Sequence, residues 1–228
     1  MRYRSLTAAL VVLVPGLVLG QQVAEAAPSR ITATCSPGVP YKLVVSRPDA
    51  YVDFRLGRDC PRTVASASWD VTRPDGYSIG FGCGVGQTCR AAIYELPIGR
   101  AAKWEPTSGI GWDKNGRKVA DLVPATSMVK TGAAIGLTGV RQGTKTTVYA
   151  RATYYSTKSK AFTRHHGRVL FQKRDIGSNT WTDLGWAYPN TKTGAASYTI
   201  ITNRSRDYRV YVPSSSTVWY AYSATKRV

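Results

Sequence analysis

Apolar and polar residues alternate along most of the chain with a period of two, the spacing of a β-strand with one buried face. No stretch shows the period of about 3.6 residues that an amphipathic helix requires. Lys114-Asn115-Gly116-Arg117 favours a tight hairpin with a type I′ turn, because Asn-Gly tolerates positive φ. In the first part of the chain we predict strands at residues 30–35, 41–45, 51–56, 63–72, 89–96 and 118–123.

The alternation is cleaner beyond residues 123–132, which we interpret as a boundary between two domains. We predict strands there at residues 148–154, 169–171, 181–186, 196–200, 208–212 and 218–222, with one more if 133–137 is extended. Six or seven short strands in about 100 residues are typical of an immunoglobulin-like sandwich. The pattern predicts an all-β fold of two antiparallel β-sandwich domains in tandem, the second immunoglobulin-like. Tyr208 fits either the tyrosine corner of such a domain or plain core packing.

The first 26 residues have the layout of a secretory signal peptide. Arg2 and Arg4 form a positive head, an apolar stretch covers residues 6–20, and small residues precede a cleavage site after Ala26. The apolar stretch is shorter than the about 20 residues of a membrane-spanning helix. We therefore expect a secreted, extracellular protein with no membrane span and with domains at residues 27–129 and 130–228.

Four cysteines follow this leader, and an extracellular location favours a disulfide framework. Three pairings of Cys35, Cys60, Cys83 and Cys89 are possible. We favour Cys35 with Cys60 and Cys83 with Cys89, because the second pair closes the glycine-rich loop 84–88. The alternative is a metal site, but no C-x-x-C pair exists and both histidines lie far downstream. We expect no metal and no cofactor.

The formal net charge is +18, and most of it falls in the second predicted domain. Residues 27–129 hold 13 lysines and arginines against nine acidic residues, whereas residues 130–228 hold 16 against three. Such a field attracts polyanions and weakens as salt is added. The extracellular candidates are teichoic acid, acidic polysaccharides, anionic lipid head groups and DNA bound without sequence preference. The alternative is that the charge only keeps the protein soluble.

Several segments resemble known β domains. Those of the second domain are Val148 to Tyr154, Gly167 to Gln172, Thr180 to Thr182 and Asp207 to Val210. They resemble the immunoglobulin-like or fibronectin type-III-like domains of many secreted actinobacterial proteins, over roughly residues 135–228. The stretch 65–74 resembles an N-terminal β domain of small secreted proteins of that group. The resemblance implies no catalytic residues, and Lys173 departs from it, because such domains usually place an apolar residue there.

Two motifs raise the question of catalysis. Gly76-Tyr77-Ser78-Ile79-Gly80 matches the G-x-S-x-G pattern of hydrolases, with Asp113 and His165 following in hydrolase order. A nucleophile elbow needs a helix directly after the serine, but a glycine-rich run follows Ser78 instead. His165 and His166 are neighbours that point to opposite faces of an extended chain, in what we interpret as an exposed loop. We predict a non-enzymatic protein, with a serine hydrolase using Ser78 as a remote alternative.

The second domain offers one candidate binding surface. If the strand that begins at Arg168 pairs with the strand that begins at Asp207, alternation directs Val169, Phe171, Tyr208 and Val210 into the core. The outer face then carries Arg168, Gln172, Arg174, Arg209 and Tyr211. Arginine donates two parallel hydrogen bonds to phosphate or carboxylate, and tyrosine stacks on a sugar or base.

We therefore predict a secreted binding protein that holds an acidic extracellular or cell-wall polymer through ligand residues Arg168, Arg174, Arg209 and Tyr211. The alternative is a secreted inhibitor or protein-interaction module. It would present the disulfide-closed loop 83–89 to a protein partner.

Overall fold

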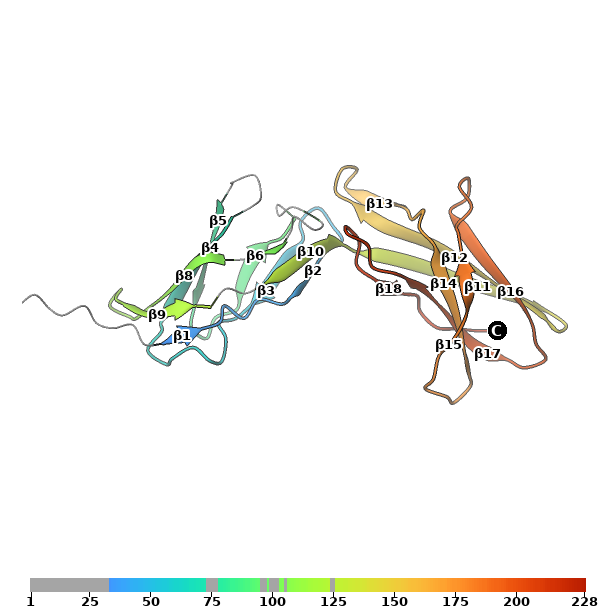
Figure 1. The fold of residues 1–228 in the computed structure, drawn as a ribbon, viewed down its shortest axis with the longest axis horizontal. Coiled ribbons are helices and arrows are strands. Elements are labelled where there is room, and N and C mark those ends of the chain that lie inside the picture. The colour runs from blue at the N-terminus through green and yellow to red at the C-terminus, as the bar shows by residue number, and fades with distance from the viewer. Residues whose placement is uncertain (1–32, 73–77, 95–97, 99–102, 105, 124–125) are drawn as a thin grey trace, which may run out of the picture. The chain divides into compact units, whose positions relative to one another are not determined.

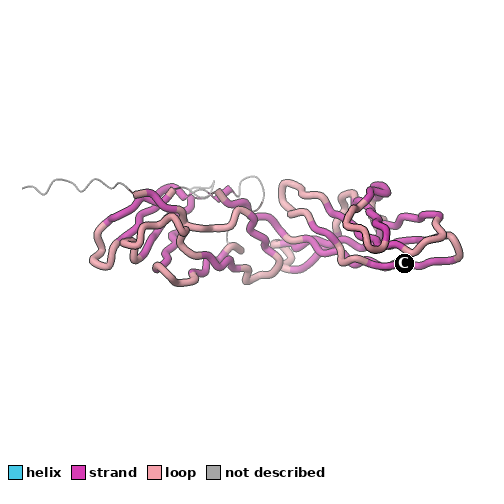
Figure 2. The backbone as a smooth tube through the Cα atoms, turned by 90° about the horizontal axis from the view of Figure 1, so that it is seen from below, coloured by secondary structure: helices cyan, strands magenta, loops and turns pink. Residues whose placement is uncertain are grey.

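A computed structural model describes residues 33–72, 78–94, 98, 103–104, 106–123 and 126–228. The predicted signal peptide, residues 1–26, lies outside the described residues. The described chain consists of strands and loops without a helix (Figure 2). Within these ranges, accordingly, there is no helix with the length and apolar character that crossing a membrane requires.

The first strands form a five-stranded, a three-stranded and a two-stranded sheet with the orders β1-β9-β8-β4-β5, β2-β10-β7 and β3-β6 (Figure 1). The strands are β1 (Thr34–Cys35), β2 (Lys42–Val45), β3 (Tyr51–Phe54), β4 (Ser66–Thr72), β5 (Ser78–Gly84), β6 (Cys89–Ala92), β7 (Lys103–Trp104), β8 (Pro106–Trp112), β9 (Lys118–Leu122) and β10 (Ser127–Thr131). The pairs β1–β9 and β2–β10 are parallel, whereas the other pairs of these sheets are antiparallel.

The predicted strands of this part are found in shortened form, but β5 and β8 were not expected from the sequence. Both are rich in glycine, a residue of low strand propensity, although β5 alternates Ile79, Phe81 and Cys83 with glycines. Glycine has a packing role in β8, since a Cβ on Gly109 would lie 2.6 Å from the Leu122 Cβ. In addition, β10 forms within the stretch interpreted as the domain boundary. The boundary itself stays a prediction.

The predicted hairpin joins β8 to β9, but its turn is not of type I′. That type needs positive φ at two consecutive residues, and here Gly116 has a φ of 75° while Asn115 does not enter the positive region. Instead the Asp113 carboxylate accepts hydrogen bonds from the backbone N–H groups of Asn115 and Arg117, both at 2.8 Å. The aspartate side chain thus supports the turn, a role that the Asn-Gly pair alone did not reveal.

The remaining strands form two sheets. They are β11 (Ala133–Gln142), β12 (Lys145–Ser156), β13 (Ala161–Arg164), β14 (Val169–Asp175), β15 (Thr182–Ala187), β16 (Ala195–Ile201), β17 (Arg206–Val212), β18 (Ala221–Tyr222) and β19 (Lys226–Arg227). In one sheet β12 pairs with β11, β13 and β16; in the other the order is β15-β14-β17-β18, with β19 also on β17 (Figure 1). All these pairs are antiparallel, as predicted.

Two clusters of buried side chains lie within residues 31–228, which form one compact unit. In the first cluster Trp69 packs between Phe54 and Phe81, with ring centroids 5.2 and 6.0 Å away. The second is centred on Phe171, Tyr208 and the valines of β14 and β17.

Tyr155 of β12 and Tyr208 of β17 are buried. Tyr155, rather than Tyr154, is the buried tyrosine of β12, and it packs in the first cluster. The alternation of β12 therefore ends before Tyr154, and the next buried side chain is that of Tyr155. Tyr208 is 1% exposed, and its hydroxyl has no hydrogen-bond partner among the described residues. The tyrosine-corner hydrogen bond is thus not formed, and core packing describes Tyr208.

The favoured disulfide pairing is confirmed. Cys35 is bonded to Cys60 and Cys83 to Cys89, so that no cysteine is free. The first bridge fixes the loop after β3 to the buried end of β1, and the second closes the turn between β5 and β6.

Candidate ligand-binding face

The sheet β15-β14-β17-β18 positions all the arginines that the sequence proposed as ligand residues. β14 and β17 pair in the predicted antiparallel register, with Phe171 opposite Val210 and Gln172 opposite Arg209. Alternation then directs Val169, Phe171, Tyr208 and Val210 inward, and each is 1% exposed or less. Their neighbours along the two strands are left on the outer face of the sheet.

Arg209 is the most constrained residue of that face. Its guanidinium lies 4.2 Å from the ring centroid of Trp181 and 4.2 Å from that of Tyr222. Its Nε donates a hydrogen bond of 2.7 Å to Oε1 of Gln172, whose own amide donates to Asp183 at 2.6 Å. The rings and Gln172 fix the guanidinium, and the Nη groups remain as donors for a ligand in the plane of the fork.

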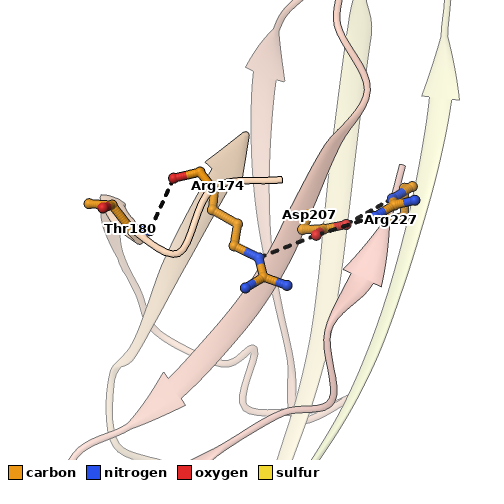
Figure 3. Close-up of polar contacts among 5 residues, drawn as sticks. Arg174, Thr180, Asp207 and Arg227 are labelled. Atoms are coloured by element: carbon orange, nitrogen blue, oxygen red, sulfur yellow. Dashed lines mark hydrogen bonds and ion pairs between the residues drawn. The ribbon is translucent and has the colours of Figure 1, made fainter. Parts of the chain in front are cut away.

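Arg174 is held differently, because an acidic side chain neutralises it. Its Nε is 3.2 Å from the carboxylate of Asp207, which Arg227 approaches from the other side at 2.9 Å (Figure 3). The hydrogen bond from Arg227 lowers the pKa of Asp207, and Arg174 lowers it further against the opposing effect of burial. Asp207 therefore stays ionised and occupies Arg174, whose guanidinium also lies 4.8 Å from Trp181.

Arg168 and Tyr211 complete the predicted set. Arg168 immediately precedes β14 and is exposed, and its guanidinium lies 4.3 Å from the ring of Trp186. Tyr211 is half-buried beside Tyr222, with ring centroids 4.8 Å apart, and Tyr220 lies 6.4 Å away. Burial raises the pKa of Tyr211, with the two neighbouring tyrosines adding to the effect. Its hydroxyl is therefore protonated at neutral pH and can donate a hydrogen bond.

These contacts define one surface, which we call the arginine–aromatic face. Its members are Arg168, Arg174, Trp181, Trp186, Arg209, Tyr211, Tyr220 and Tyr222. From Arg168 to Arg174 the strand advances about 20 Å, at about 3.3 Å per residue. A face of that length alternates cations with rings and can contact several consecutive units of a polymer.

The sequence placed the arginines correctly but missed the aromatic partners. Trp181 precedes β15 and Tyr222 belongs to β18, so their contacts with Arg209 depend on strand pairing that no local pattern reveals. One signal was available for the tyrosines: Tyr220 and Tyr222 are two residues apart, a spacing that puts both on one face of an extended segment.

The Ser78 motif does not form a nucleophile elbow. Ser78 is the first residue of β5, pairs with Thr72 of β4 and is followed by six further strand residues, where the motif requires a helix. Residues 73–77, which include the first two positions of the motif, lie outside the described residues.

The two histidines differ from one another. His166 is exposed, as expected, but His165 is partly buried, and no hydrogen-bond partner of its Nε2 occurs in the described ranges. Burial lowers the pKa of His165, with the adjacent His166 adding to the effect, so the ring is neutral at pH 7. Within the residues that the structure places, no group of three His, Cys, Asp or Glu side chains is arranged to hold a metal ion.

The loop of the alternative prediction is closed by the Cys83–Cys89 bridge. At its tip Val85 is 48% exposed and Gly86 adopts a φ of 75°. Arg55 donates a hydrogen bond of 3.0 Å to the Thr88 hydroxyl, which ties the loop to the end of β3.

Comparisons with known proteins concern the fold. No protein-family model matches the chain, and no curated protein matches it. Among solved structures, a cytokine receptor complex is 16% identical over 81% of this chain and 93% of its own, with a TM-score of 0.41. A two-domain fibronectin type-III segment from chicken tenascin is 12% identical over 81% and 94%, at a TM-score of 0.33. The FN1–FN3 domains of chicken CNTN1 are 9% identical over 86% and 66%, at 0.34.

The chain is all-β, with β-sandwich folds in tandem.

Proposed function

We propose that this protein is a secreted, non-enzymatic binding module that holds an acidic extracellular polymer on the arginine–aromatic face. The observation that supports the proposal is the contact of the Arg209 guanidinium with two rings, those of Trp181 and Tyr222, at 4.2 Å from each ring centroid. A guanidinium fixed in this way keeps its fork oriented before the ligand arrives, so less side-chain entropy is lost on binding. Phosphate or carboxylate groups of the polymer are the complementary chemistry.

The ligand roles are unequal. Arg209 and Arg168 carry the proposed contacts to the polymer anions, because neither forms an ion pair in the described part of the chain. Arg174 also contacts Trp181, and it is ion-paired with Asp207. Tyr211 and Tyr222 offer rings and hydroxyls to the units between the anions. The excess of cations in residues 130–228 adds a long-range attraction that salt screens.

The proposal is tested by co-sedimentation of the protein with bacterial cell walls across a salt series, with walls stripped of teichoic acid as the reference. We expect the double variant Arg168→Ala, Arg209→Ala to bind at least about tenfold more weakly and with a flatter salt dependence. The matched control is Lys158→Ala, Lys192→Ala, which removes the same charge from exposed turns outside the face. Equal weakening in both variants would contradict the proposal, because net charge alone would then explain the binding.

A second candidate function involves the loop between β5 and β6. The disulfide-closed loop 83–89 presents exposed Val85 on a constrained turn, which is the form of a protease inhibitor or of another protein-binding element. Inhibition of a protease that tolerates salt and disappears in the Val85→Asp variant would favour this candidate over the first, provided that the protein does not bind cell walls.

A further inference from the structure

A hollow of about 310 Å³ lies at the end of the β14–β15 hairpin. The hairpin turn contributes the hydroxyl-bearing residues Ser178 and Thr180 to its wall, and β15 contributes Thr182. Two basic side chains, Lys173 and Arg206, come from β14 and β17. Arg174 and Asp175 complete the lining. The volume is far larger than the about 30 Å³ of one water molecule, so a polyatomic ion fits together with part of its hydration shell.

Lys173 is the unusual residue of this hollow. It has the same position in the alternation of β14 as Val169 and Phe171, and its register partner on β17 is Tyr208, the largest fully buried side chain. The position is thus directed toward the core side of the sheet, where a sandwich normally places an apolar residue. In the part of the chain that the structure describes, no hydrogen bond or ion pair holds the Lys173 ammonium. The Lys173 side chain is partly exposed, so its ammonium is available to an anion in the hollow.

Arg206 supplies a second, more deeply placed cation. Its side chain is 16% exposed, and its Nε lies 2.7 Å from the carboxylate of Asp175. A further hydrogen bond joins its Nη1 to the Thr202 hydroxyl. Asp175 balances this one charge, and Asp207 is already engaged by Arg174 and Arg227. The lining therefore retains positive charge, chiefly on Lys173.

The hydroxyl groups give the hollow its second kind of donor. The Ser178 hydroxyl oxygen accepts a hydrogen bond of 3.0 Å from the backbone N–H of Thr180, which leaves its own proton for another acceptor. The Ser178 N–H is bonded to the Asp175 carbonyl at 3.0 Å, and Gly177 has a φ of 85°, so the turn is well defined. Hydroxyls and cations together suit an ion that accepts several hydrogen bonds at once.

From this combination we propose that the hollow binds a tetrahedral oxyanion, the sulfate or phosphate group of an ester, with Lys173 as its principal charge partner and with Thr180 and Ser178 as hydroxyl donors. The site is separate from the arginine–aromatic face and shares only Arg174 with it. Binding of the oxyanion does not depend on binding of a polymer, so this proposal is independent of the proposed function.

The test is a titration of the full chain with inorganic sulfate and, separately, inorganic phosphate, followed by backbone amide NMR shifts at constant ionic strength in chloride. We expect saturable shifts confined to residues 173–182 and 206. Saturation by both ions would indicate recognition of any tetrahedral oxyanion. Saturation by only one would identify the ligand as a sulfate ester or as a phosphate ester. Linear shifts spread over many basic residues would overturn the proposal, because they indicate non-specific screening.

Variants sharpen this titration. Lys173→Met keeps the length of the side chain and should weaken the affinity at least about tenfold, since hydrogen bonds to charged groups contribute the most. Lys192→Met, at an exposed turn position, is the matched control and should bind like the wild type. Thr180→Val, at an exposed position of the hairpin, serves as a second probe and should weaken binding by a smaller factor. Wild-type affinity in both Lys173→Met and Thr180→Val would sink the proposal.

The outcome can be separated from that of the wall-binding experiment. Arg168→Ala, Arg209→Ala should lose wall binding and still bind the inorganic anion. If wild-type protein binds walls but not inorganic anions, the oxyanion site fails alone; in the reverse case only the polymer proposal fails.

Discussion

Tryptophan serves two different purposes in the two groups of strands. Trp69 of β4 is 3% exposed and packs between two phenylalanines inside the first cluster. Trp181 is partly exposed in the second group, and its ring contacts the guanidinium groups of Arg174 and Arg209. The first arrangement gains stability from apolar burial, whereas the second fixes charged groups at a surface.

The two groups also differ in how their strands are held. Strands β1 to β10 have at most seven residues, include two parallel pairs and are joined by two disulfides. Strands β11 to β19 contain no cysteine, and β12 alone extends over 12 residues. Short glycine-rich strands bury little apolar area each, and covalent cross-links compensate by reducing the entropy of the unfolded chain. Long, regular pairing makes such links unnecessary.

The largest expected effect comes from the second cluster. Phe171→Ala should lower the free energy of unfolding by about 3–5 kcal/mol, because it leaves a cavity beneath β14. Urea denaturation measures the loss, and amide hydrogen exchange locates it. If the clusters are independent, exchange accelerates in β12, β14 and β17 while β4 stays protected. Faster exchange in β4 as well would show that both clusters unfold together, as the position of Tyr155 in the first cluster permits.

The disulfides should be unequal in effect. Cys35→Ala with Cys60→Ala opens a loop with a separation of 25 residues and should lower the free energy of unfolding by about 3.5 kcal/mol. Cys83→Ala with Cys89→Ala opens one with a separation of six and should cost about 2 kcal/mol. Urea denaturation of the two double variants provides the comparison. Equal losses would contradict the explanation by unfolded-state entropy.

Two tyrosines of the second cluster should respond with opposite signs. Tyr208→Phe removes a buried hydroxyl without a partner among the described residues and should raise the free energy of unfolding by up to about 1 kcal/mol. Tyr198→Phe is the matched control, because the Tyr198 hydroxyl donates a hydrogen bond of 2.8 Å to the Leu184 carbonyl. That variant should lose about 1 kcal/mol. A loss in both variants would mean that the Tyr208 hydroxyl is satisfied in solution.

The smallest effect concerns acid pH. Since Arg227 and Arg174 lower the pKa of Asp207 in the folded protein, its ionised form stabilises the fold. This contribution is complete above about pH 4 and is lost as the pH falls through the lowered pKa. Asp207→Asn should flatten the pH dependence of the urea midpoint between about pH 2 and pH 6. Asp53→Asn, which removes the exposed ion pair of Asp53 with Arg90, should change it less because solvent screens that pair.

Features set by residues close together in the sequence were predicted better than features set by the pairing of distant strands. The inward positions of β14 and β17 followed from alternation, because successive side chains of a strand point to opposite faces. The disulfides followed from chain spacing, since a bridge between Cys83 and Cys89 needs only a short turn. By contrast, β5 and β8 were missed, because both are rich in glycine, a residue of low strand propensity. The partial burial of His165 was also missed.

Residue pattern and spacing alone predicted that the chain is built of strands, where most of them lie and where the positive charge is concentrated, and they favoured the cysteine pairing that the structure confirms. These properties depend on residue type and on spacing between near neighbours. The pairing of distant strands brings Trp181 and Tyr222 to Arg209, pairs Asp207 with Arg174, and places Lys173 in a hollow with Arg206. Those arrangements join residues from different strands, and their geometry exists only once β14, β15, β17 and β18 have paired.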